Sequence, residues 1–198
     1  MRSHKTTFLT QHEGDLANQD RREWLVRAGS FSLMAALGFV SHEASAKTLE
    51  LGKPAPALVL RTLDGHSIAT RDLIGNVVVV AFWATWCEPC CEELPILSAY
   101  AKQKADAGVK VLGFSIDTPD ELPKVKKMAQ DLSFPVGLLG SAYAGDYGRI
   151  WKLPVSFVID RKGLLAHNGW NDESHTGMTE SKLKAIVDPL LDGTKSRL

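Results

Sequence analysis

A continuous hydrophobic stretch, VVVVAFW, occupies residues 77–83. β-branched and aromatic residues make up most of it, and such a run is typical of a strand buried on both faces of a largely parallel sheet. Residues 109–116 (VKVLGFSI) and 155–160 (VSFVID) predict two further strands. A turn at residues 161–163 then leads to residues 164–167, the predicted hairpin partner of the last strand.

Hydrophobic residues also recur at helical spacing between and after these strands. This spacing predicts helices over residues 88–104, 118–132 (capped by Thr118 or Asp120), 142–151 (short and irregular) and 179–191. Short strand candidates occupy residues 58–60, 67–69 and 135–139. The resulting order, β-α-β-α-β-α-β-β-α, predicts an α/β sandwich with a mixed central sheet flanked by helices. Its parallel half needs crossover helices, while a hairpin completes the sheet.

The first 46 residues do not fit this domain, which we expect to span residues 47–198. Arg21 and Arg22 precede a hydrophobic run at residues 28–40, and a short polar stretch then ends in Ala44-Ser45-Ala46. A basic region, a hydrophobic segment of this length and an A-x-A site are the three parts of a secretory signal.

The paired arginines, followed by Trp24 and Leu25, resemble a twin-arginine (Tat) signal. The hydrophobic run is shorter than the roughly 20 residues that span a bilayer. We therefore expect residues 1–46 to be a Tat-like signal that is cleaved after Ala46, which makes the mature protein periplasmic. The alternatives are an uncleaved anchor at the periplasmic face of the inner membrane and a helix that belongs to the fold.

Composition narrows the range of partners. Lys and Arg together number 23, and so do Asp and Glu. The bulk charge therefore gives no reason to expect a nucleic-acid or anionic-membrane partner. The length of 198 residues and the hydrophobic content of 44% are ordinary for one globular domain. Three cysteines are too few for a disulfide-stapled scaffold, and they fit one working pair plus a spare thiol.

All three cysteines lie in AFWATWCEPCCEELP, residues 81–95. Cys87 follows the predicted strand and opens the helix, where unpaired backbone N–H groups stabilise a thiolate. Cys90 lies about one helical turn further on, close enough to attack a mixed disulfide formed at Cys87. Pro89 stiffens this turn without breaking the helix. A zinc site needs about four ligands, and no second cysteine or histidine cluster supplies them, so we expect no metal.

The succession of strand, W-C-x-P-C motif and helix resembles the thioredoxin superfamily, and within it the exported TlpA/ResA-like thiol–disulfide oxidoreductases. The resemblance covers residues 50–192. Residues 51–87 match the family's N-terminal β-hairpin and redox strand, and residues 117–150 are similar to its central insertion. The resemblance implies a thioredoxin-like sandwich, a redox-active Cys87–Cys90 disulfide in place of a bound cofactor, and disulfide-containing client proteins as partners.

Further family residues carry over by position. Pro154 matches the family's cis-proline, which faces the disulfide and forms the peptide-binding edge, and Leu153 stands where the family often has Val or Thr. Glu93 matches the acidic residue of the family's C-E-P-C-x-x-E segment. It lies one helical turn after Cys90, where a partly buried carboxylate can accept or donate the proton of the resolving thiol; the alternative is a solvent-exposed glutamate in the first turn of the helix. Trp86 is expected to shield the sulfurs and to contact partners. Ala81 stands where cytosolic thioredoxins carry a buried Asp, which raises the importance of Glu93.

Cys91 leaves three alternatives open. It is an uninvolved side chain, or a ligand of a Sco-type copper site with Cys87 and either His167 or His175, or the partner in a regulatory or intermolecular disulfide. We expect the first, because Sco-type chaperones lack the W-C-x-P-C context. A peroxiredoxin is the rival enzyme class on this fold, but it needs a Thr three residues before its reactive cysteine, and Thr85 is only two residues before Cys87.

Together these residues predict a periplasmic protein-disulfide reductase of the kind that serves cytochrome c biogenesis or copper-site assembly. Because the exported compartment is oxidising, the resemblance also implies a DsbD/CcdA-type membrane protein that reduces the cysteine pair again. The opposite direction, disulfide formation, depends on the reduction potential of the pair, which the residues leave open.

Overall fold

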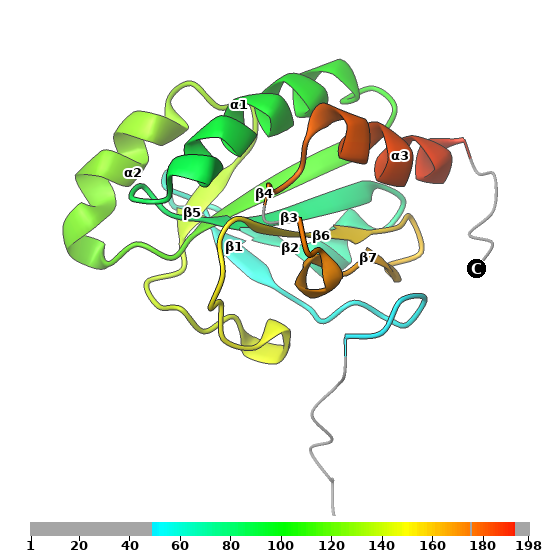
Figure 1. Ribbon diagram of the computed structural model, residues 1–198, viewed down its shortest axis with the longest axis horizontal. Coiled ribbons are helices and arrows are strands. Elements are labelled where there is room, and N and C mark those ends of the chain that lie inside the picture. The colour runs from blue at the N-terminus through cyan, green and yellow to red at the C-terminus, as the bar shows by residue number, and fades with distance from the viewer. Residues whose placement is uncertain (1–48, 175, 193–198) are drawn as a thin grey trace, which may run out of the picture. The chain divides into compact units, whose positions relative to one another are not determined.

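The computed structural model describes residues 49–174 and 176–192; the predicted signal, residues 1–46, and His175 lie outside this range. The strands are β1 (Val59–Arg61), β2 (Ser67–Ala69), β3 (Val77–Trp83), β4 (Val109–Ser115), β5 (Val136–Leu138), β6 (Val155–Ile159) and β7 (Leu165–His167), and the α-helices are α1 (Glu88–Gln103), α2 (Leu122–Ala129) and α3 (Glu180–Leu191) (Figure 1). None of the helices in this described part is long and apolar enough to cross a membrane.

Five strands form one sheet in the order β5-β4-β3-β6-β7, and β1 pairs with β2 in a separate hairpin. Strand β4 runs parallel to both β3 and β5, whereas β6 runs antiparallel to both β3 and β7. The predicted mixed sheet with an N-terminal hairpin is therefore confirmed. The segment predicted as an insertion, residues 117–150, lies between β4 and β6 along the chain and supplies α2 and the edge strand β5.

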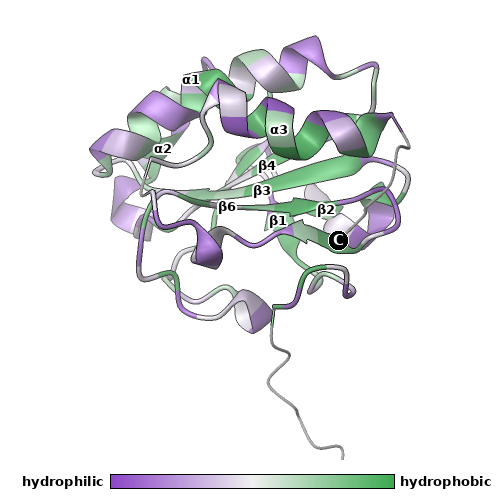
Figure 2. Ribbon diagram, turned by 45° about the vertical axis from the view of Figure 1, so that its right-hand side comes forward, coloured by the Kyte–Doolittle hydropathy of each residue, from purple (hydrophilic) through white to green (hydrophobic). Residues whose placement is uncertain are grey.

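Every residue of β3 is buried, because both faces of the sheet are covered. Val77, Val79 and Ala81 belong to a core shared with α1 and α3. Val78 and Val80 point to the other face, into a second core with side chains from β1, β4 and β6. Figure 1 shows α1 and α3 together on one side of the sheet, and Figure 2 shows the hydrophobic residues along its central strands. This double packing holds the carboxyl end of β3 in place for the residues that follow it.

The N-terminal hairpin lies so close to the edge of the sheet that no side chain fits between them. A Cβ atom on Gly137 of β5 would lie 2.0 Å from the carbonyl oxygen of Arg61 at the end of β1. The next residue, Thr62, forms an isolated antiparallel bridge with Gly137. Glycine at this position of β5 therefore permits the backbones to touch.

Two predicted helices need correction. The helix predicted over residues 142–151 is wrong: only Gly145–Tyr147 form a single 3₁₀ turn. The first residue of that turn and Gly148 both adopt positive φ angles, +56° and +81°, which an α-helix does not accommodate. The helix predicted over residues 118–132 begins instead with a 3₁₀ turn at Pro119–Glu121 and continues as the shorter α2. All other predicted boundaries agree within one residue.

Candidate active site

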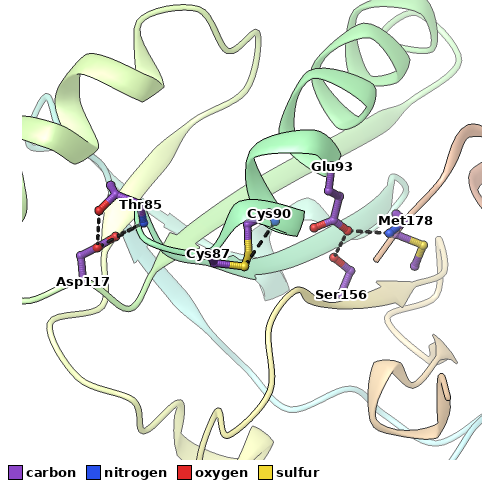
Figure 3. Close-up of a disulfide and its surroundings, with 7 residues drawn as sticks. All are labelled: Thr85, Cys87, Cys90, Glu93, Asp117, Ser156 and Met178. Carbon is purple, nitrogen blue, oxygen red and sulfur yellow. Dashed lines mark hydrogen bonds between the residues drawn. A yellow bond between two sulfur atoms is a disulfide. The ribbon is translucent and has the colours of Figure 1, made fainter. Parts of the chain in front are cut away.

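The cysteines of the C-x-x-C motif lie where the carboxyl end of β3 meets α1. Cys87 is the N-cap of α1 and is disulfide-bonded to Cys90, with 5.2 Å between the two Cα atoms (Figure 3). Cys87 is 6% exposed and Cys90 is 0% exposed. Cys87 is therefore the more accessible residue of the pair.

The first turn of α1 supplies positive charge to the sulfur of Cys87. The backbone N–H of Cys90 donates a hydrogen bond to Cys87 Sγ at 3.3 Å, and the aligned peptide dipoles add roughly half an elementary charge at the helix N-terminus. Pro89 lies within this turn and is exposed. On reduction, the same N–H group stabilises the Cys87 thiolate, which is the form that attacks a disulfide.

The residues predicted to bind substrate come from two segments of the chain, one beside the disulfide in the sequence and one before β6. Trp86 precedes Cys87 and is 64% exposed, so a bound polypeptide can contact it, whereas Trp83 is fully buried in the core as expected. The Leu153–Pro154 peptide bond is cis, as the resemblance implies. It directly precedes β6, which pairs with β3.

Glu93 is 2% exposed, so the alternative of a solvent-exposed glutamate is wrong. Its Oε1 atom accepts hydrogen bonds from the backbone N–H of Met178 at 2.7 Å and from the hydroxyl of Ser156 at 3.1 Å (Figure 3). Its Oε2 atom is buried and has no hydrogen-bond partner among the described residues. Burial raises the pKa of Glu93 to about 7, although the hydrogen bonds from Met178 and Ser156 oppose this shift. Glu93 thus has a free oxygen and a pKa suited to proton transfer near neutral pH.

A loop before α3 closes the site, and sequence reasoning missed it. A Cβ atom on Gly177 would lie 2.7 Å from Cγ of Pro154 and 2.9 Å from Cδ of Glu93, and Gly177 has a positive φ of +64°. Only glycine fits there without displacing either residue. The sequence contained no signal for this contact, because the loop is polar and lies 85 residues after Glu93 along the chain.

A second cluster that sequence reasoning missed holds the segment between β3 and Cys87. Asp117, 1% exposed at the end of β4, accepts hydrogen bonds from the backbone N–H of Thr85 at 2.9 Å and from its hydroxyl at 2.7 Å (Figure 3). The hydroxyl of Ser115 donates a third at 2.6 Å. The carboxylate thereby fixes the backbone two residues before Cys87. The sequence does show an Asp directly after a predicted buried strand, but no neighbouring residue indicates which group donates hydrogen bonds to it.

Replacing Asp117 by alanine is expected to lower the free energy of unfolding by about 2 to 3 kcal/mol, because the buried hydroxyl of Ser115 and the partly buried donors of Thr85 lose their acceptor. Equilibrium urea unfolding measures the effect. Asp120→Ala, at an exposed position nearby, is the matched control and is expected to change stability by less than about 0.5 kcal/mol. Equal effects of the two substitutions would contradict the anchoring role of Asp117.

Cys91 lies on the exposed side of α1 as a free thiol, since Cys87 pairs with Cys90. His167, proposed above as a copper ligand, is partly buried on β7. Within residues 49–174 and 176–192, no group of three or more His, Cys, Asp or Glu side chains could hold a metal ion. The described residues thus do not assemble a copper site from Cys87, Cys91 and His167.

Cys91→Ser is expected to leave disulfide-reductase activity within about twofold of the unmodified protein and stability within about 0.5 kcal/mol, as for an exposed position without buried contacts. Turbidimetric insulin reduction and thermal unfolding measure the two quantities. Cys90→Ser, one position earlier on the helix, is the comparison variant, and it is expected to lose catalytic turnover in the insulin assay. A large loss of activity in Cys91→Ser would show that Cys91 takes part in the disulfide exchange.

Three comparisons with known proteins agree with this geometry. A sequence model of the AhpC/TSA family matches residues 51–168. Thiol-disulfide oxidoreductase ResA of Bacillus thuringiensis (strain Al Hakam) is 34% identical over 159 residues, which cover 78% of this chain and 91% of ResA. Thiol:disulfide interchange protein DsbE of Haemophilus influenzae is 32% identical over 145 residues, which cover 71% of this chain and 76% of DsbE. A solved thiol:disulfide interchange protein of the thioredoxin family from Chlorobium tepidum TLS has a TM-score of 0.58 and 28% identity, covering 70% of this chain and 96% of that one.

The region that the family model matches contains β3, α1, both paired cysteines and Pro154. The relatives are named for thiol–disulfide chemistry rather than for peroxide reduction, in agreement with the position of Thr85 relative to Cys87. The chain therefore belongs to the AhpC/TSA family, has the thioredoxin-like fold, and is a thiol–disulfide oxidoreductase of the ResA/DsbE type.

Proposed function

We propose that this oxidoreductase works as a reductase of disulfide bonds in extracytoplasmic client proteins. The observation that carries the proposal is the Cys87–Cys90 disulfide at the start of α1, where Cys87 is 6% exposed and Cys90 is 0% exposed. A pair of cysteines in this position exchanges two electrons with another disulfide and needs no bound cofactor.

The reaction begins when the Cys87 thiolate attacks one sulfur of a client disulfide held beside Pro154. The client's other sulfur leaves as a thiolate and takes up a proton from solvent. Cys90 then transfers its proton to Glu93 and attacks Cys87, which restores the Cys87–Cys90 disulfide. The client's second sulfur leaves as a thiolate and takes up a proton from solvent, so the client is released as a dithiol and two electrons have passed to it from the protein.

Glu93 suits the second step for a physical reason. Its pKa is raised to about 7 by burial, so near neutral pH the ionised and protonated forms are both populated. The ionised form accepts the proton of the buried Cys90 thiol, and the unpartnered Oε2 atom is free to receive it. When the electron donor breaks the Cys87–Cys90 disulfide again, Cys90 leaves as a thiolate and protonated Glu93 returns the proton to it.

The proposed cellular location of the protein, and with it the proposed partners, follow from the predicted signal at residues 1–46. Export and cleavage after Ala46 would deliver the domain to the periplasm; retention of the signal would tether it to the periplasmic face of the inner membrane. A DsbD/CcdA-type membrane protein would then re-reduce Cys87 and Cys90. Apocytochromes c awaiting haem, or the copper-site cysteines of an oxidase, are the proposed clients.

The reduction potential of the Cys87–Cys90 pair tests the proposed direction. Equilibration of the purified protein with glutathione or dithiothreitol buffers, followed by alkylation and mass spectrometry, measures it. A value below about −200 mV is expected of a reductase, whereas a value near −120 mV is typical of a protein that oxidises its clients and would overturn the proposed direction. Cell fractionation, with the mass of the mature chain, tests export and cleavage.

A further inference from the structure

An exposed tryptophan lies three residues before Pro154. Trp151 is 69% exposed, more than any other large hydrophobic residue in the described part of the chain. Large aromatic side chains are usually well buried in monomeric proteins, and those left exposed at a fixed position are typical of binding surfaces. Trp151 is therefore an unusual feature at the edge of the redox site.

The ring of Trp151 is held in one orientation by a second tryptophan. It stacks on Trp170, with 5.5 Å between the ring centroids and 10° between the planes. Trp170 in turn packs edge-to-face on Phe157 of β6 at 5.7 Å and donates a hydrogen bond from Nε1 to the carbonyl of Tyr147 at 3.2 Å. Trp170, on which Trp151 stacks, is thus held in place by contacts with the core.

A lysine adds to this positioning. The ammonium group of Lys152 lies 5.8 Å from the centre of the Trp151 ring and donates a hydrogen bond to the carbonyl oxygen of Asp172 at 2.6 Å. A cation over an aromatic ring attracts it, so the contact restricts the side chain further. Its positive charge disfavours Lys or Arg as an occupant of the adjoining surface, and the exposed Trp151 ring favours a hydrophobic or aromatic one.

We propose that Trp151, supported by Trp170, binds a large hydrophobic or aromatic side chain of the client polypeptide, close in sequence to the client cysteine that reacts with Cys87. This inference rests on the proposed function, because Pro154 then marks where the client chain runs. Lys152 and Leu153 connect Trp151 to Pro154 along the chain. Three residues of extended chain span about 10 Å, so the favoured side chain is expected two to four positions from the client cysteine.

Such a surface favours some clients over others without taking part in the disulfide exchange itself. A rigid aromatic pair loses little conformational freedom when it binds a side chain. Aromatic pairing of this kind corresponds to a preference of about two- to tenfold over a serine at the same client position. A small disulfide that does not reach Trp151 gains nothing from it.

The test uses peptides with a single cysteine, presented as symmetric disulfides. In one series a tryptophan occupies each of positions two to four on either side of the cysteine, and the reference peptide has only serine there. Single-turnover oxidation of the reduced protein, quenched by alkylation and read by mass spectrometry, gives second-order rate constants. Hydroxyethyl disulfide serves as the small substrate.

We expect the unmodified protein to react about two- to tenfold faster with at least one tryptophan peptide than with the serine peptide. Trp151→Ala is expected to remove this preference, while Trp151→Phe retains part of it. Both variants are expected to react with hydroxyethyl disulfide within twofold of the unmodified protein. Ile74→Ala is the matched control, since Ile74 is 58% exposed but precedes β3, at the opposite end of the strand from Cys87.

Each other outcome has a distinct meaning. No preference in the unmodified protein, or a preference that survives Trp151→Ala, would overturn the role of Trp151 and leave the proposed function standing. Failure to react with hydroxyethyl disulfide as well as with all peptides would overturn the proposed function itself. Concentration-dependent self-association that Trp151→Ala abolishes would show that a second copy of this chain, rather than a client, occupies the surface.

Discussion

Cys87→Ser is expected to lower the rate of client-disulfide reduction by a factor on the order of 10³ or more, the scale on which enzymes lose activity with their nucleophile. A serine hydroxyl remains protonated at neutral pH, so the stabilisation that the first turn of α1 offers to a thiolate has no anion on which to act. Insulin-disulfide reduction in the presence of dithiothreitol measures the loss over the uncatalysed rate.

Cys90→Ser is the informative companion to Cys87→Ser. It keeps the nucleophile but lacks the group that releases the client, so it is expected to accumulate a mixed disulfide between Cys87 and the client. Intact-mass analysis after incubation with an oxidised client detects this adduct. An adduct that forms through Cys91, or one that forms in Cys87→Ser, would contradict the assignment of Cys87 as the attacking residue.

Glu93→Gln is expected to slow the second step, attack of Cys90 on the mixed disulfide, by about 100-fold at neutral pH, the lower end of what general acid–base catalysis contributes. Glutamine keeps the shape and the Oε1 acceptor for Met178 and Ser156, but it cannot take a proton. In the unmodified protein the rate of this step should rise as pH increases through about 7, the pKa of Glu93. In the variant this rise should be absent.

The same pKa predicts how stability depends on pH. The pKa of Glu93 is raised from 4.5 to about 7 in the folded protein. The stability associated with protonated Glu93 is therefore fully present below about pH 4.5 and is lost as pH rises through about 7, because the unfolded chain releases the proton first. A shift of this size corresponds to about 3 kcal/mol.

Urea unfolding at several pH values tests this expectation against two variants. The difference in unfolding free energy between the unmodified protein and Glu93→Gln should fall between pH 4.5 and 7.5 and level off above that range. Glu92→Gln, an exposed neighbour on the same helix, should show no such trend. A flat difference for Glu93→Gln would mean that folding does not raise the pKa of Glu93, and the proton-transfer role would then lose its basis.

The hydrophobic pattern predicts the strands well, because each central strand is buried on both faces and so forms an unbroken apolar run. VVVVAFW becomes β3 at the predicted residues. The helices that lack such a run are predicted less well. Over residues 142–151, the glycines at 145 and 148 take positive φ angles that hydrophobic spacing does not reveal.

The sequence itself identifies the redox pair and predicts which cysteine attacks first, since Cys87, Pro89 and Cys90 lie within one helical turn after a buried strand. Only the tertiary structure decided what surrounds that pair. Glu93 acquires its burial and its partners from Ser156 and Met178, which lie 63 and 85 residues away along the chain. Asp117 reaches Thr85 across 32 residues. The pKa of a carboxyl group and the anchoring of a loop depend on groups that the sheet and the loop before α3 bring together, and residue spacing within one segment carries no information about them.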